Sequence, residues 1–124
     1  MPNQQNEEFR LLLKSLHLEM KQLADFWGIS LRSVQRWAEG SQDLPNARRE
    51  TLLEWQRWAD KKAKAYVTIY HETNPATFII YDQADFNALE LPKMPTQVHQ
   101  SAVSRAKFLL EQKGHTVKIK RYVP

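Results

Sequence analysis

Three side chains that can donate or accept several hydrogen bonds lie close together: Arg32, Gln35 and Arg36. The stretch from Gly28 to Ala38 that contains them has no acidic residue. On a helix, residues 32 and 36 are one turn apart and share a face. Arginine can form two parallel hydrogen bonds with guanine or with a phosphate, and glutamine can do so with adenine. The pattern therefore predicts a surface for nucleic acid, and the alternative is a solvated face of an ordinary small helical bundle.

The elements that must position these side chains are predicted by apolar periodicity. Apolar residues recur at three- and four-residue spacing over four helical segments, residues 6–18, 20–27, 31–39 and 46–71. Gly28 can supply the positive φ that ends the second helix, and the Ser30 hydroxyl can cap the third. Trp37 and Trp55 are assigned to the core rather than to recognition. Two short helices joined by such a tight turn are typical of a helix-turn-helix.

The second half of the chain has a mixed pattern of strands and helices. We predict strands over 76–81 and 116–122 and helices over 83–89 and 96–113. Asp82 and Thr96 are the expected helix caps, and Val117 and Ile119 should form the half-buried face of a strand whose other face is basic. Residues 65–70 fit either a strand or a continuation of the long fourth helix, and the unbroken apolar stripe favours the helix.

These elements predict an α+β fold in two parts. Residues 1–64 should form a helix-turn-helix bundle with a long fourth helix, and residues 65–124 a small strand-helix-strand dimerisation unit. The chain has only 124 residues, so the core is small and dimerisation would help to stabilise it. Its net charge is +4, and residues 105–121 carry six basic residues against one acid. The polar start and the short apolar runs predict no signal peptide and no membrane segment, and we expect a cytoplasmic protein.

Residues that could support catalysis or bind a metal are scattered. The histidines show neither HxH nor HExxH spacing, and each is expected at the surface or at a cap: His17, His71, His99 and His115. The chain has no cysteine, which excludes a disulfide framework, a thiolate zinc site and a cysteine nucleophile. It has three glycines and no glycine-rich phosphate loop. We therefore expect no enzyme activity, no metal and no cofactor.

The segment from Leu23 to Gly40 resembles helix-turn-helix domains of the lambda-repressor (XRE) type. The matching residues are Leu23-Ala24, Gly28-Ile29-Ser30, Val34, Arg36-Trp37 and Gly40. A narrower resemblance is to anti-CRISPR-associated (Aca) autorepressors and YdiL-like regulators, whose RSxQxWxxG…P pattern is similar to Arg32-Ser33, Gln35, Trp37, Gly40 and Pro45. The run from Gln100 to Val103 also looks similar to that group. The resemblance extends loosely over nearly the whole chain.

The resemblance implies a homodimeric, sequence-specific repressor that binds an inverted repeat in double-stranded DNA. The target would be the promoter of its own anti-CRISPR or mobile-element operon. The implied base-reading residues are Leu31, Arg32, Gln35 and Arg36. The implied contacts to the DNA backbone are Met20, Lys21, Gln22, Ser30, Ser33, Ser41, Gln42, Arg48 and Arg49.

Three alternatives stay open from the sequence. The chain could be an antitoxin-like DNA-binding protein that also binds a protein partner through its basic C-terminal region. It could be a protein-interaction module whose helix-turn-helix no longer reads DNA. The basic segment from Thr116 to Arg121 could also bind RNA.

Overall fold

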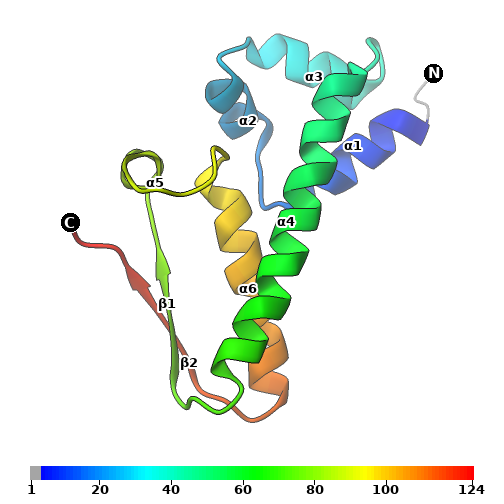
Figure 1. Cartoon of the computed structure of the whole chain (residues 1–124). Coiled ribbons are helices and arrows are strands. Elements are labelled where there is room, and N and C mark those ends of the chain that lie inside the picture. The colour runs from blue at the N-terminus through cyan, green and yellow to red at the C-terminus, as the bar shows by residue number, and fades with distance from the viewer. Residues whose placement is uncertain (1–3) are drawn as a thin grey trace. The chain divides into compact units, whose positions relative to one another are not determined.

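The computed structural model describes residues 4–124 and has an α+β fold (Figure 1). In this range there are six helices and one two-stranded parallel sheet. The elements are α1 (Gln4–Ser15), α2 (Met20–Trp27), α3 (Leu31–Glu39), α4 (Asn46–Tyr70), β1 (Ala76–Ile80), α5 (Gln83–Ala88), α6 (Thr96–Gln112) and β2 (Val117–Arg121). Contacts divide the chain into two compact units, the N-terminal unit ending at Arg57 and the C-terminal unit running from Trp58 to Pro124.

The N-terminal unit packs α1, α2, α3 and the first part of α4 around an aromatic core. Trp37 of α3 lies edge-on to Phe9 of α1, with ring centroids 6.2 Å apart. Trp27 of α2 contacts both Trp37 and Trp55, the latter with centroids 5.7 Å apart. Such ring pairs each add about 0.5–1.5 kcal/mol beyond the area that they bury. Both tryptophans assigned to the core, Trp37 and Trp55, are buried as predicted.

The C-terminal unit covers one face of a parallel sheet with helices. β1 and β2 pair with Phe78 opposite Ile119, and α5 and α6 form the crossover that parallel strands require. Ala76 and Phe78 of β1 are buried against α6, in a cluster that also contains Ala63 of α4. Because alternate strand residues point to opposite faces, the residues between them face away from this cluster.

Most predicted elements match the structure to within a few residues. Residues 65–70 belong to α4, so the helix prediction is confirmed for this segment. The first helix ends at Ser15 rather than at residue 18, because Leu16 and His17 leave helical geometry in a turn where His17 adopts a φ of 58°. The predicted boundary between the two parts is 64/65, and the contacts divide the chain at 57/58; both positions lie inside helix α4.

Three local predictions in the C-terminal half were wrong. Thr96 does not cap α6: Pro95 holds that position, and the Thr96 hydroxyl donates instead to the carbonyl of Tyr81 at 3.0 Å. His99 is not a surface residue but is buried among aromatic rings. The apolar face of β2 is less covered than expected, since only Val117 packs against the core cluster and Ile119 is 41% exposed.

Within residues 4–124, no helix combines the length and the apolar composition that crossing a bilayer requires.

Candidate nucleic-acid interface

The turn between α2 and α3 is fixed by a glycine and a serine. Gly28 ends α2 in the left-handed region at φ 66°, where a residue with a Cβ is strained. The next residue, Ile29, donates its N–H to the carbonyl of Ala24 at 3.0 Å, which closes the turn. Ser30 then caps α3, because its Oγ accepts the N–H of Ser33 at 3.2 Å. Both predicted caps are confirmed, and together they set where α3 begins.

The inner face of α3 is held by packing and by two side chains of α1. Val34 and Ala38 are buried along with Trp37. The Ala38 carbonyl, near the C-terminal end of α3, accepts hydrogen bonds from Asn6 Nδ2 at 3.1 Å and from Arg10 Nε at 2.8 Å. A cation at this end of a helix also interacts favourably with the helix dipole. Apolar periodicity does not predict these two contacts, because Arg10 and Asn6 lie 28 and 32 positions before Ala38 in the sequence.

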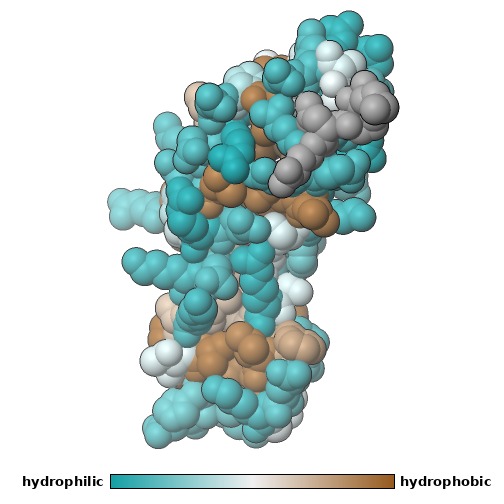
Figure 2. Space-filling model, turned by 90° about the vertical axis from the view of Figure 1, so that its right-hand side faces the viewer, coloured by the Kyte–Doolittle hydropathy of each residue, from teal (hydrophilic) through white to brown (hydrophobic). Residues whose placement is uncertain are grey.

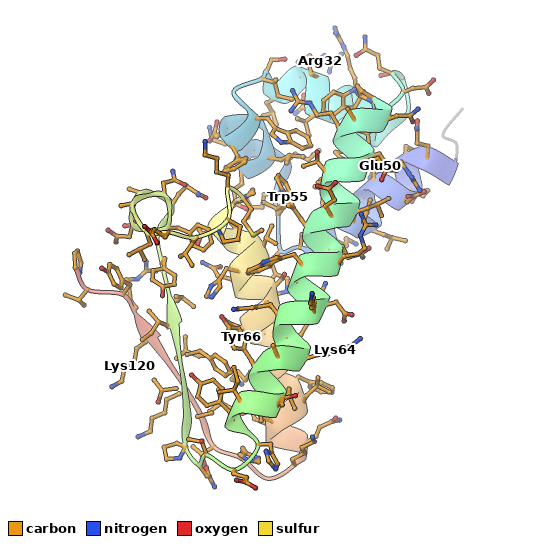
Figure 3. All side chains as sticks on the ribbon, in the orientation of Figure 1. Arg32, Glu50, Trp55, Lys64, Tyr66 and Lys120 are labelled. Atoms are coloured by element: carbon orange, nitrogen blue, oxygen red, sulfur yellow. The ribbon has the colours of Figure 1, made fainter. Side chains whose placement is uncertain are left out.

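The outer face of α3 carries the predicted base-reading residues. The Leu31 side chain is 37% exposed, and Arg32 lies on the outer side of the helix with 61% of its side chain exposed (Figure 3). Gln35 and Arg36 are half-buried. Arg36 has no ion-pair partner among residues 4–124, so its guanidinium is available to a ligand. The structure thus brings all four side chains onto one short helix.

This face is not free of acid, although the stretch from Gly28 to Ala38 is. Glu39 lies two turns after Arg32, and its Oε1 is 4.0 Å from the Arg32 Nη1. Both side chains are more than half exposed, so this ion pair contributes little to stability. An incoming phosphate or guanine would have to compete with Glu39 for the Arg32 guanidinium.

The start of α2 is less open to phosphate than the resemblance implies. Glu19 precedes the helix, and its N–H donates to Gln22 Oε1 at 3.0 Å. A carboxylate already occupies the position that the helix dipole makes favourable for an anion. Lys21 is 3.8 Å from Asp25 in an exposed pair, and Met20 is 36% exposed.

The residues after α3 that are implied to contact the DNA backbone are of two kinds: some side chains are exposed, and others already contact other residues of the protein. Ser41 and Gln42 are exposed, but their backbone N–H groups donate to the carbonyl of Arg36 at 3.1 and 3.3 Å. Arg48 lies with its guanidinium 4.5 Å from the centroid of the Trp27 ring. Arg49 is committed to Glu8 of α1, with Nη2 and Nε 2.7 and 3.0 Å from the same carboxylate oxygen. Arg48 and Arg49 therefore tie α4 to the rest of the N-terminal unit.

Charge is distributed unevenly between the two units. The sequence up to Arg57 contains eight basic and eight acidic residues, whereas that from Trp58 onward contains ten basic and six acidic residues. The whole excess of +4 therefore lies in the C-terminal unit. The N-terminal unit offers a local cationic face on α3 rather than a general positive field.

No protein-family model matches the chain, and no curated protein matches it. In the part of the chain that the structure describes, no three His, Asp or Glu residues are grouped so that they could hold a metal ion. The interpretation therefore depends on the geometry of α2 and α3.

Proposed function

We propose that the chain is a sequence-specific DNA-binding protein in which α2 and α3 form a helix-turn-helix and α3 enters the major groove. It acts as a transcriptional repressor that binds an inverted repeat as a homodimer, at the promoter of its own anti-CRISPR or mobile-element operon. The observation that carries the proposal is the two-sided character of α3. Its inner side is buried through Val34 and Trp37, while its outer side presents Arg32, Gln35 and Arg36.

The dimensions of α3 and the chemistry of its outer face support base reading. An α-helix fits the major groove of B-DNA, and arginine and glutamine match the hydrogen-bonding edges of guanine and adenine there. The caps at Gly28 and Ser30 and the two bonds to the Ala38 carbonyl hold both ends of the helix. Residues held in this way lose less conformational entropy when they bind.

Exposed apolar side chains in the C-terminal unit support the dimer. Ile69 on α4 and Phe108 on α6 are 64% and 61% exposed, and Leu109 is 39% exposed. Figure 2 shows a brown apolar area framed by polar side chains toward the lower end of the view. A short chain that leaves such residues uncovered gains stability when a second copy covers them. The antitoxin-like alternative uses the same observation, with a different protein as the partner.

The proposal is tested by binding to duplexes from the DNA upstream of the chain's own gene. Fluorescence anisotropy compares a duplex that contains an inverted repeat with a scrambled duplex of the same composition. Arg32→Ala together with Arg36→Ala should weaken binding to the repeat by roughly 1–3 kcal/mol for each lost bidentate contact. A matched control, Lys14→Ala with Arg57→Ala, removes the same charge from exposed positions of the same unit and should bind as the wild type does.

Two results would contradict the proposal. One is a wild-type protein that binds both duplexes equally, and the other is an Arg32/Arg36 variant that keeps full affinity for the repeat. Light scattering on the purified chain tests the homodimer independently. A monomer that becomes a complex only with the product of a neighbouring gene would favour the antitoxin-like alternative.

A further inference from the structure

The outer face of the two-stranded sheet is an uncovered surface with only positive charge. In the register of the sheet, Thr77 pairs with Lys118 and Ile79 pairs with Lys120. These four residues alternate with those that pack on the helices, so they share the opposite face. Figure 3 shows Lys120 pointing away from α6 and α4.

No acid of either strand or of their flanking segments offsets these lysines. Residues 73–81 and 112–124 contain no Asp or Glu, and Lys118 and Lys120 are exposed with no ion-pair partner among residues 4–124. Elsewhere in the unit, Lys64 and Lys107 are paired with acids one turn away on their own helices. The strand β2 therefore carries three basic residues, Lys118, Lys120 and Arg121, with no acid in the strand or in the segments that flank it.

We propose that this sheet face binds the phosphate backbone of duplex DNA without regard to sequence. The choice of DNA as the polyanion rests on the function proposed above. Lys118 and Lys120 are two residues apart on a strand, about 6.6 Å at ~3.3 Å per residue. Successive phosphates of one DNA strand advance by about 3.4 Å along the axis, so this spacing covers about two phosphate steps, and the flexible four-carbon stems of the lysines allow each ammonium group to reach a separate phosphate.

The composition of the face favours a duplex backbone over other partners. A second copy of the same face would bring Lys118 and Lys120 against like charges, which is unfavourable. Single-stranded nucleic acid is held largely by stacking on free aromatic rings, and this face has none. Tyr122, the residue that follows β2, packs against Tyr81 with ring centroids 5.2 Å apart.

The test measures how salt weakens binding to a scrambled duplex. The full chain is compared with a Lys118→Gln/Lys120→Gln variant between about 50 and 200 mM salt. The plot of log affinity against log salt has a negative slope, and each lost phosphate contact should make that slope less steep by about 0.9. The variant's slope should therefore be shallower than the wild type's by nearly 2, and its affinity at low salt should be lower by tenfold or more. The control variant Lys61→Gln/Lys93→Gln removes two exposed lysines from the same unit and should keep the wild-type slope.

The design separates this proposal from the function proposed above. An unchanged slope in the Lys118/Lys120 variant overturns the sheet face, even if the wild type prefers the inverted repeat. A lowered slope without any preference for the repeat supports the sheet face and overturns the sequence-specific function. Single-stranded RNA and phosphatidylserine vesicles are parallel arms. If the variant loses binding only to one of them and keeps it for the duplex, the assignment to DNA is wrong.

Discussion

Acid should destabilise this protein through His99, which lies inside the C-terminal unit. Its ring is 5.5 Å from that of Tyr81 and 5.8 Å from that of Phe86, and its Nε2 is 3.2 Å from the Tyr66 hydroxyl. Its Nδ1 is buried and has no hydrogen-bond partner among residues 4–124. Burial, with a smaller contribution from the charge of Lys62, lowers the pKa of His99 to about 4 from 6.5.

The size of the effect follows from the difference between the two pKa values. Above pH 6.5 the histidine is neutral in both the folded and unfolded states, and the folded state has no penalty. Below that pH the unfolded chain binds a proton that the folded chain does not, so the free energy of unfolding falls by about 1.4 kcal/mol per pH unit. The fall continues to about pH 4 and amounts to roughly 3 kcal/mol, a large part of a typical total of ~5–15 kcal/mol.

Urea unfolding, followed by tryptophan fluorescence at a series of pH values, measures this loss. Replacing the imidazole in a His99→Phe/Tyr66→Phe variant removes the titrating ring and leaves no unpaired hydroxyl, so its stability should depend less on pH by about that amount. The control variant Val98→Ala creates a cavity at a neighbouring buried position and should lower stability by the same amount at each pH. If the histidine-free variant loses stability in acid as steeply as the wild type, the role assigned to His99 is wrong.

Two further substitutions test how the N-terminal unit is held. Gly28→Ala should cost about 1–2 kcal/mol, because φ is 66° there and no atom lies near the added Cβ, so the cost is conformational. Gly28→Asn should recover part of the loss, and equal melting temperatures for the glycine and alanine proteins would contradict the turn geometry. Glu8→Gln should cost at most about 1 kcal/mol, since the pair with Arg49 is only partly buried. If Arg49 binds DNA phosphate instead, the same substitution would strengthen duplex binding in the salt titration.

Local structure was predictable where the signal lies within a few residues. The bounds of α2 and α3 follow from the glycine at position 28, the serine at position 30 and apolar spacing of three and four. The continuation of α4 through Tyr70 follows from an apolar stripe that keeps its phase, against the strand preference of the β-branched residues there. In each case the nearest neighbours in the sequence carry the information.

Features that depend on distant partners were not predictable in the same way. The burial of His99 has no signal in the sequence, because the rings that enclose it come from α4, from α5 and from Tyr81, the residue that follows β1. The pair of Arg49 with Glu8, 41 residues earlier, likewise has no local signal in the sequence. The pair of Arg32 with Glu39 differs from these two, because residues seven apart on one helix share a face, so the sequence does contain the signal for it.

The distribution of charge bears on how one small chain could combine affinity with selectivity. Attraction to a polyanion depends on net positive charge and is blind to sequence, whereas base reading depends on a few hydrogen bonds in fixed positions. The N-terminal unit has balanced charges and rigidly held donors on α3, which suit selectivity. The C-terminal unit holds the entire excess charge, with Lys118 and Lys120 uncompensated on an open sheet face. If the proposed function holds, a reading unit without net charge would limit binding to wrong sequences and the cationic unit would maintain affinity, so the two requirements would be met by different residues.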